Sequence, residues 1–333
     1  MPTIEDVARE AGVGIGSVSR VLNGGPYVSD ALRERVLAAI ERLGYRPSPV
    51  ARAFGARRTR TIELLVPLFM APCFLQALRG IEEGLSGSHY ALLVRTIQDA
   101  GDRDRAFEEC CRRGQSDGAL VLWLTPPSSF FERLTLDPVP AVLLNVTADE
   151  ARSVGVDHDA SARDAVDYCI RIGHRRIALV DRAIDAFDPA SHGLCVDGYR
   201  QALLQAGLPR VKAYEQKADF SQMGGAMALQ TFLEQSEPPT AVVAASEVQA
   251  IGIVLAARDR GWRVPGDLSV VGYSDSQYSE YLGLTTIGVP VQDIGREATR
   301  MLLAALADPA SAPQSIFRPT ELLVRATCGP PRS

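Results

Sequence analysis

The sequence contains no long hydrophobic run and no leader of the secretory type. Of its 333 residues, 46% are hydrophobic and only 6% are aromatic. The longest apolar stretch, residues 64–75, is interrupted by Pro67 and Pro72, and it is shorter than the roughly 20 apolar residues that cross a bilayer as a helix. The first residues lack the basic and apolar regions of a signal peptide. We therefore expect a cytoplasmic protein, long enough for about two domains.

Cysteine and histidine are scarce, and their spacing builds neither a metal site nor a disulfide framework. The six cysteines include no CxxC pair, and the four histidines have no metal-ligand pattern. Cys169 and His174 are close in sequence, but they come without an acid that would orient them as a nucleophilic pair. We expect reduced thiols, no metal, no cofactor and no enzymatic activity.

The chain as a whole has no excess of positive charge, since its net charge is −5. This charge is unevenly distributed. Residues 1–60 carry ten arginines and six acidic residues, a net charge of +4, whereas the remainder carries 25 basic and 34 acidic residues, a net charge of −9. A short basic segment joined to an acidic body indicates that one end faces phosphate. A solvated basic linker is the alternative that charge alone leaves open.

The first 45 residues have the pattern of three short helices. A capping pair, Thr3 and Asp6, precedes apolar residues at helical spacing, and Gly12 is a typical C-terminal stop. A second helix is expected over residues 15–22 and a third within residues 29–44. A helix, a tight turn, a short helix and a supporting helix are the outline of a helix-turn-helix unit.

The glycines of this segment offer a second interpretation, because GVGIGS (12–17) is close to a dinucleotide-binding fingerprint. That fingerprint follows a buried strand. Here a charged amphipathic helix precedes it, and we therefore favour the helix-turn-helix interpretation.

A further short helix is expected within residues 47–55. Ser48 suits an N-cap, Pro49 the first helical position and Gly55 a helix end. Two turns are fewer than the roughly 12–15 residues that an isolated helix needs in water, so this helix should form only against a partner. Phe54 lies within this basic segment, and we do not expect it to be ordinary core.

Beyond residue 60, apolar strand-like runs alternate with amphipathic helices. Strands are expected at 62–66, 91–94, 119–124, 141–144, 177–180, 241–244 and 268–271, and helices at 74–85, 160–172, 198–206 and 248–260. This alternation predicts parallel sheets in a doubly wound α/β arrangement. The length favours two lobes, with a ligand cleft at the carboxyl ends of the strands.

Short segments along the whole chain carry a family pattern. In the first 60 residues they are TIEDVA (3–8), AGV (11–13), VSRVLN (18–23), GYRP (44–47) and VAR (50–52). In the body they are SVGVD (153–157), GHRRIA (173–178), GYR (198–200), VP (264–265), DLSVVGY (267–273), LTT (284–286), GREA (295–298) and ELLVR (321–325). With these residues the chain resembles the LacI/GalR, or lactose-repressor, family of transcription factors.

The resemblance implies three parts. They are a helix-turn-helix DNA-binding headpiece at 1–46, a hinge helix and linker at 47–60, and a two-lobed effector-binding and dimerisation domain at 61–333 that is similar to periplasmic binding proteins. One lobe is expected at about 61–157 and 291–318, and the other at about 158–290 and 319–333. The chain would then cross between the lobes three times, near 155–160, 285–291 and 318–322.

The resemblance also implies which residues contact DNA. The second helices of a dimer would enter successive major grooves of a pseudo-palindromic operator, and paired hinge helices would enter the minor groove. The implied contact residues are Thr3, Ile15, Gly16, Ser17, Arg20, Asn23, Tyr45, Ser48, Val50, Ala51, Arg52 and Phe54.

Three of these DNA-facing positions depart from the family pattern. Gly14 stands where a capping Ser is usual, Gly16 where a polar reader is usual, and Phe54 where a Leu wedge is usual. Since Gly16 offers no side chain to a base, readout is expected to depend on Arg20, whose fork suits guanine, and on apolar contact from Ile15. Phe is an established wedge type. A surface aromatic in a linker is the alternative for Phe54.

Seven positions match the family's effector pocket: Phe74, Asn145, Cys195, Phe220, Ser246, Ser274 and Val289. The two rings suit stacking on a ligand. The polar positions diverge, with Asn145 in place of Asp and Cys195 in place of Arg. Because the usual acid and base are both lost, we expect a neutral effector. A pocket that has lost its effector is the alternative.

Together these observations predict a homodimeric, sequence-specific repressor of the nucleoid that binds double-stranded DNA and a small molecule. A solute-binding protein of a transporter is the alternative from another class, and the basic headpiece argues against it. An α/β enzyme finds no catalytic constellation in the sequence.

Overall fold

The computed structural model describes residues 2–22, 28–45, 59–67, 72–110, 114–136, 139–146, 151–183 and 195–332. The helix expected within 47–55 lies outside the described residues, as does Asn23. Among the described helices, none is long and apolar enough to span a membrane.

The N-terminal part consists of α1 (Ile4–Ala11), α2 (Ile15–Leu22) and α3 (Asp30–Leu43). The expected signals act as predicted: Thr3 caps α1, and Gly12 and Gly44 end α1 and α3 in the left-handed conformation. The three helices close on a small core of buried residues, namely Val7, Ala8, Ala11, Val18, Val21, Val36, Ala39 and Tyr45. The expected three-helix unit is confirmed.

The first lobe contains a six-stranded sheet with the order β11-β5-β4-β3-β1-β2, and all its neighbouring strands are parallel. The strands are β1 (Thr61–Pro67), β2 (Ala91–Ile97), β3 (Gly118–Leu122), β4 (Ala141–Leu144), β5 (Arg152–Gly155) and β11 (Ser315–Phe317). The helices are α5 (Pro72–Leu85), α6 (Ala100–Cys110), α7 (Ser128–Leu136) and α13 (Val291–Ala307).

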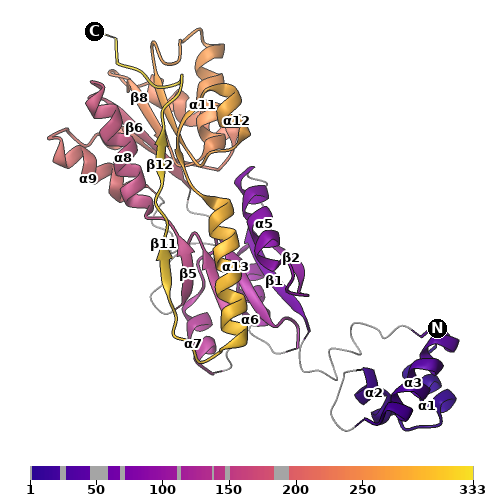
Figure 1. Cartoon of the computed structure of the whole chain (residues 1–333). Helices are drawn as coiled ribbons and strands as arrows, with labels where there is room; N and C mark the ends of the chain where they lie inside the picture. The colour runs from indigo at the N-terminus through magenta and orange to yellow at the C-terminus, as the bar shows by residue number, and fades with distance from the viewer. Residues whose placement is uncertain are drawn as a thin grey trace.

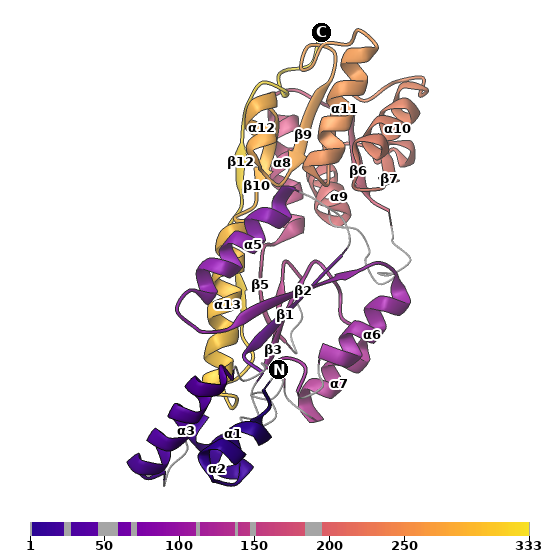
Figure 2. The same cartoon turned by 90° about the vertical axis from the view of Figure 1, so that its right-hand side faces the viewer.

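Helices cover both faces of this sheet (Figures 1 and 2). Alternate residues of β1 enter different cores: Leu64 packs in the core that includes α5 and α13, and Leu65 packs in the core that includes α6 and α7. A strand that is buried on both faces has apolar residues at every position rather than at every second one. This explains the continuous apolar run of β1.

The second lobe contains another six-stranded sheet, with the order β12-β10-β9-β8-β6-β7, in which only β12 is antiparallel to its neighbour. Its strands are β6 (Ile177–Arg182), β7 (Glu215–Ala218), β8 (Ala241–Ala244), β9 (Ser269–Tyr273), β10 (Thr285–Gly288) and β12 (Glu321–Leu323). Its helices are α8 (His158–Arg171), α9 (Val196–Gln205), α10 (Gln222–Leu233), α11 (Glu247–Asp259) and α12 (Gln277–Leu282), with a short 3₁₀ helix, η1 (Lys212–Tyr214).

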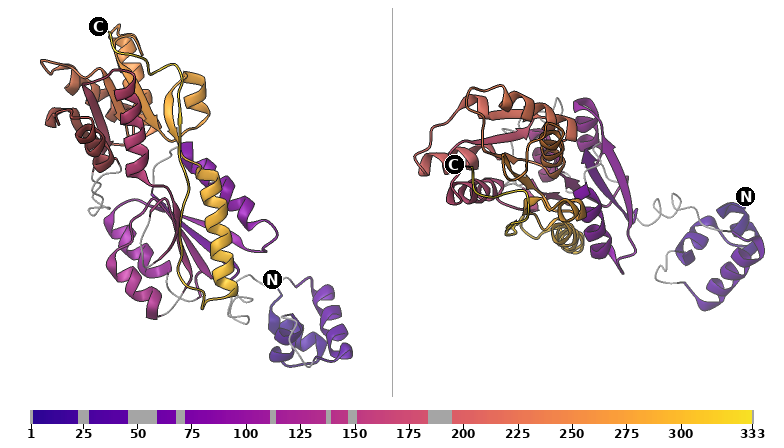
Figure 3. Two further views of the ribbon diagram at one scale, coloured as in Figure 1. Left: turned by 60° about the vertical axis from the view of Figure 1, so that its left-hand side comes forward. Right: turned by 90° about the horizontal axis from the view of Figure 1, so that it is seen from above.

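The chain passes between the two sheets after β5, after β10 and after β11. The last passage is visible in Figure 1, where β11 and β12 follow one another along the molecule, and Figure 3 shows the two lobes in further views. In each sheet the strand order reverses beside one strand, β1 in the first and β6 in the second. Such reversal points at the carboxyl ends of strands are where doubly wound α/β folds bind ligands. The expected fold class, a helical headpiece with doubly wound parallel sheets in two lobes, is confirmed.

Candidate functional sites

The outer face of α2 is exposed to solvent. Val18 and Val21 hold the helix against the headpiece core, whereas Ile15 is 47% exposed and Arg20 is exposed. The Nε of Arg20 donates to the backbone oxygen of Gly16 at 3.3 Å. A short helix that is buried on one face and open on the other has the form of a helix that reads a DNA groove.

Gly14, which precedes α2, and Gly16 within α2 are not required by packing. No heavy atom lies within 4 Å of the place where a Cβ would stand on Gly14 or on Gly16, and neither residue has a positive φ. Larger side chains therefore fit at both positions. The absence of a side chain at Gly16 concerns what the helix can contact, not how it folds.

Other expected DNA contacts have structural roles of their own. The backbone N–H and the hydroxyl of Thr3 donate to the Asp6 carboxylate at 2.9 and 2.8 Å, and these hydrogen bonds hold the pKa of Asp6 below its usual value. Tyr45 is only 8% exposed and lies in the headpiece core, while Ser17 is half-buried in α2. The remaining positions, Asn23, Ser48, Val50, Ala51, Arg52 and Phe54, lie outside the described residues.

A cavity of about 60 Å³ lies where the carboxyl ends of strands from both sheets meet. Trp123 and Asn145 directly follow β3 and β4 of the first sheet, whereas Arg182 ends β6 and Ser274 follows β9 of the second sheet. The full lining is Pro72, Cys73, Trp123, Asn145, His158, Arg182, Phe220, Ala245, Ser246, Glu247, Val248, Tyr273, Ser274 and Val289. The location is the one that the fold predicts for a ligand.

The structure brings together most of the expected effector residues. The lining includes Asn145, Phe220, Ser246, Ser274 and Val289.

Two expected effector residues do not line this cavity. Cys195 is fully buried in the core at the N-terminus of α9, where burial raises the pKa of its thiol well above the usual value. Phe74 borders a separate groove between α5 and α12. Cys195 is the N-cap of α9 and packs in the core cluster that also contains Tyr199 and Tyr273.

The expectation of a pocket without acid and base is wrong. Both Arg182 and Glu247 line the cavity and are almost fully buried, at 7% and 3% exposure. The family pattern did not include these two residues. A rule that searches for polar residues at strand ends would have found them, because Arg182 ends β6 and Glu247 closely follows β8. The same rule finds Trp123 and Tyr273, which the family pattern also missed.

Glu247 carries a buried negative charge that its neighbours stabilise. Its carboxylate accepts hydrogen bonds from the backbone N–H groups of Ser276 and Ser279, at 3.1 and 3.0 Å, and from both serine hydroxyls. Ser276 is the N-cap of α12, so the carboxylate also lies at a helix N-terminus, where negative charge is favoured. The acid joins the start of α11 to the start of α12.

His158 and Tyr273 form a hydrogen-bonded pair at the cavity. The Nδ1 of His158 lies 2.7 Å from the Tyr273 hydroxyl, and its Nε2 lies 3.4 Å from the backbone oxygen of Asn145. Burial is the main cause that lowers the pKa of His158 and raises the pKa of Tyr273. Both groups are therefore neutral near pH 7, and together they link the first residues after β5 to the end of β9.

Backbone strain is concentrated at the cavity. Trp123, Asn145 and Ser274 all have positive φ, at 54°, 57° and 73°, a conformation that costs energy for residues other than glycine. Each of the three directly follows a strand and lines the cavity. Strain that persists in this way is typical of functional sites.

Both lobes bound the cavity, and they contact each other beside it. The Cys73 thiol lies at the start of α5 near Ser274, and burial raises the pKa of this thiol to about 12. The Gln76 side chain donates to the backbone oxygen of Asp275 at 2.9 Å. A displacement of one lobe relative to the other would therefore change the cavity directly.

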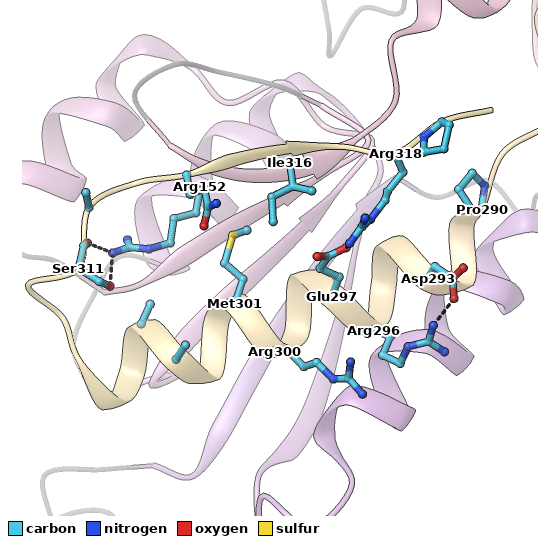
Figure 4. Close-up of a pocket in the computed structure, with 15 residues that line it drawn as sticks. Arg152, Pro290, Asp293, Arg296, Glu297, Arg300, Met301, Ser311, Ile316 and Arg318 are labelled. Atoms are coloured by element: carbon cyan, nitrogen blue, oxygen red, sulfur yellow. Dashed lines mark hydrogen bonds and ion pairs between the residues drawn. The ribbon is translucent and has the colours of Figure 1, made fainter.

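A larger, open groove of about 740 Å³ runs between α13 and β11 (Figure 4). Its charged side chains engage one another: Arg318 pairs with Glu297, Arg296 with Asp293, and Arg152 donates to Ser311. Among the described residues that line this groove, none is aromatic. The smaller cavity at the strand ends is the better candidate for a ligand site because it is buried, aromatic and strained.

No cluster of potential metal ligands occurs among the described residues.

The architecture and the two sites define a class of protein, the ligand-responsive DNA-binding regulators, in which a helix-turn-helix unit is joined to a two-lobed α/β binding domain. The sequence profile of bacterial regulatory proteins of the lacI family matches residues 3–48, and that of the periplasmic binding protein-like domain matches residues 166–328. The chain belongs to the LacI family of transcriptional regulators.

Individual relatives agree over nearly the full length. The chain is 34% identical to catabolite control protein A of Priestia megaterium, over 90% of this chain and 91% of that protein. It is 33% identical to the transcriptional repressor CytR of Escherichia coli K12, over 98% of this chain and 96% of that protein. The structure of the lac repressor dimer bound to operator and the anti-inducer ONPF matches with a TM-score of 0.80 and 25% identity, over 98% of both chains.

Proposed function

We propose that the chain is a cytoplasmic homodimeric repressor whose α2 helices read successive major grooves of a pseudo-palindromic operator. The observation that carries this proposal is the outer face of α2, which presents Ile15 and Arg20 while its inner face is buried. Two such short helices related by a two-fold axis match the symmetry of a palindromic site. The resemblance to a lac repressor dimer on its operator supports the same arrangement.

The proposed domains are the headpiece at 1–46, the hinge and linker at 47–60, and the effector-binding domain at 61–333. In this scheme residues 47–55 form a helix in the minor groove, and Phe54 is the wedge. A wedge of this type separates two base pairs, at a cost that wider protein contact offsets. No enzymatic activity, metal or cofactor is proposed.

An exposed apolar face supports the proposed dimer. Leu75 of α5, Leu93 of β2, Met227 of α10, Leu255 of α11 and Tyr281 of α12 are between 41% and 79% exposed. In Figure 2, α5, β2, α11 and α12 lie on the side that faces the viewer, and α10 packs against α11. Exposed apolar side chains that gather on neighbouring elements are typical of a protein interface.

The cavity between the lobes is the proposed effector site. A small molecule that binds one arrangement of the lobes better than another shifts the population of arrangements by its difference in affinity. Since residues of both lobes line the cavity, such a shift would reach the hinge and the headpiece. The neutral effector that the sequence suggested is not carried forward, because its reason, a pocket without acid and base, does not hold.

The proposal is tested by selecting random DNA duplexes with the purified protein and titrating salt. Enrichment of a pseudo-palindrome with a steep negative salt slope is the expected result. Arg20→Gln should reduce operator affinity and relax specificity at one base pair, by about 1–3 kcal/mol, whereas Arg33→Gln on the exposed face of α3 serves as a matched control. Weak binding without a preferred sequence would overturn the proposal.

The wedge has its own test. Phe54→Ala should weaken binding to the selected operator more than binding to unrelated duplex, because only the specific complex opens a base step. Equal losses on the two duplexes would show that Phe54 does not intercalate.

A further inference from the structure

One carboxylate holds the chain where the proposed linker enters the first lobe. The Oδ1 of Asp117 accepts hydrogen bonds from the backbone N–H and the hydroxyl of Thr59, at 2.6 and 2.8 Å, and its Oδ2 accepts one from the backbone N–H of Arg60 at 3.0 Å. Asp117 directly precedes β3, so a residue at the start of a central strand binds a segment far away in the sequence. We call these three contacts the Asp117 clamp.

The clamped segment is also bonded to the elements on both sides of β1. The backbone oxygen of Arg60 accepts a hydrogen bond from the N–H of Ala91, the first residue of β2, at 2.9 Å. The backbone oxygen of Thr61 accepts one from the N–H of Asp117, also at 2.9 Å. The direction in which the chain enters β1 is therefore fixed by the amino ends of the two neighbouring strands.

These bonds hold Arg60 in a strained conformation. Its φ is 52°, in the left-handed region that residues other than glycine rarely adopt. Such a conformation persists only where the surrounding structure holds it. Because the Arg60 residue is exposed, the hold comes from its backbone bonds to Asp117 and Ala91. Without the clamp, this segment is expected to relax to another direction.

The clamp and the cavity lie at opposite ends of the same strands. β1 begins at Thr61 and β3 at Gly118, next to Asp117, and the two strands pair in parallel from this end. Trp123 follows the other end of β3 and lines the cavity. Six positions separate Asp117 from Trp123, and an extended strand spans them in about 20 Å. A movement of the first lobe therefore carries the cavity wall and the clamp together.

We propose that Asp117 is a positioning residue for operator binding. It sets the direction in which the linker leaves the first lobe, and it acts through Thr59 and Arg60 rather than by contact with DNA. This inference rests on the proposed DNA-binding function. Loss of the clamp should weaken binding to the operator but not to unrelated duplex, because only the specific complex demands one placement of the headpiece on the bases.

The test compares full-length variants on the selected operator and on unrelated duplex. Asp117→Ala should lower operator affinity at least tenfold and leave the affinity for unrelated duplex within twofold. Loss of a negative charge on its own favours binding to DNA, so charge cannot account for a lower affinity. Asp104→Ala removes an acid from the exposed surface of α6 and is the matched control, which should not lower operator affinity.

A milder pair of variants tests the clamp from its other side. Thr59→Val removes the hydroxyl donor with little change of shape and should lower operator affinity threefold or more. Thr59→Ser retains the hydroxyl and should stay within twofold of the wild type. In the Asp117→Ala background, Thr59→Val should have little further effect, because the two residues act as a unit. This pair decides the question if melting temperatures show that Asp117→Ala does not fold.

Hydrogen exchange reports on the clamp in the absence of DNA. The amides of Thr59 and Arg60 donate to Asp117 and should exchange at least tenfold faster in Asp117→Ala. Faster exchange with unchanged operator affinity, or equal losses on operator and unrelated duplex, would overturn the inference. A wild-type protein that selects no operator would overturn the proposed function as well, whereas a wild type that selects one and an Asp117→Ala variant that binds it equally would overturn this inference alone.

Discussion

Gly16 limits what α2 can contact, although the packing of the helix does not require a glycine at this position. The helix tolerates a larger side chain at this position, because the place of a Cβ is empty, and yet the chain has none there. Glycine within a helix costs about 1 kcal/mol relative to alanine. Helix α2 is thus expected to be locally weak in the free protein, and contact with DNA is expected to order it further.

Gly16→Ala should therefore stabilise α2 by about 0.5–1 kcal/mol. Hydrogen exchange of the α2 amides in the free protein measures this change, and it should slow by a factor of about two to five. Gly44→Ala is the contrasting variant, since Gly44 has a φ of 59° and an added Cβ would strain it. Faster exchange in Gly16→Ala would contradict the open space around this residue.

Buried histidines make the stability of the protein depend on pH. His174 is 1% exposed and hydrogen-bonds with Thr240 and the backbone oxygen of Gly329, and burial lowers its pKa, as it does for His158. Their folded-state pKa values are thus below the unfolded value of about 6.5. The unfolded chain then binds more protons in this range, so stability is full above about pH 6.5 and decreases as the pH falls below it.

Urea unfolding at pH 7.5 and 5.5 checks this direction. The free energy of unfolding should fall more steeply with acid in the wild type than in His174→Gln, which has no imidazole to protonate. His89→Asn changes an exposed histidine and should leave the wild-type slope unchanged. Equal slopes in all three proteins would contradict the assignment.

The sequence predicted some of the residues that line the cavity and missed others. Asn145, Ser246 and Ser274 were found because they occupy family positions, and they do line it. Arg182 and Glu247 were missed, because a family pattern marks the positions that usually contact a ligand and these two residues are not among them. The strand-end rule would have found them.

At the scale of elements, the strands and helices followed from apolar patterning. Each of the seven expected strands corresponds to one in the structure, from β1 to β9. Five of the described strands, β5, β7, β10, β11 and β12, were not expected. Each is only three or four residues long, and β7, β11 and β12 lie at sheet edges. Their pairing depends on neighbouring strands, so local sequence does not predict it.

The crossing of α10 and α11 depends on two glycines. A Cβ on Gly225 would lie 2.1 Å from the backbone oxygen of Gln249, and one on Gly252 would lie 2.0 Å from that of Gln222. The backbones of the two helices therefore approach more closely than any larger residue allows. Gln249 in turn donates to the backbone oxygens of Ala218 and Asp219, next to Phe220 of the cavity.

Gly252→Ala should separate these helices and destabilise the protein by about 1–3 kcal/mol, a typical cost of overpacking. Chemical unfolding measures the loss. Gly101→Ala in α6 is the matched control, because its nearest neighbour is a side-chain atom at 3.4 Å, and it should leave stability unchanged or raise it. A neutral Gly252→Ala variant would mean that the helices can separate without cost.

At the scale of the whole molecule, charge and apolar surface are divided between different regions. The net charge of −5 combines +4 in the first 60 residues with −9 in the body. The acidic body should be repelled by DNA, which leaves the arginine-bearing end to dock. We expect the exposed apolar residues of α5, β2, α10, α11 and α12 to form the interface with a second copy of the chain.

The double variant Leu255→Asp/Tyr281→Asp should shift the protein from dimer to monomer, because it places charge in the proposed interface. Sedimentation velocity measures the shift, and operator affinity should fall with it, since one reading helix cannot span two half-sites. Leu204→Asp is the control, because this residue is 79% exposed on α9, away from that face. An unchanged sedimentation coefficient in the double variant would place the interface elsewhere.

The passage of the chain from β11 to β12 has a genetic consequence. These two short strands are the outer strands of the two different sheets, and both come after α13 in the sequence. A premature stop codon between Ala307 and the start of β11 at Ser315 would therefore remove an edge strand from each lobe in a single event. Neither lobe can be deleted, exchanged or inherited as one uninterrupted stretch of the gene, so the two are expected to evolve as a unit.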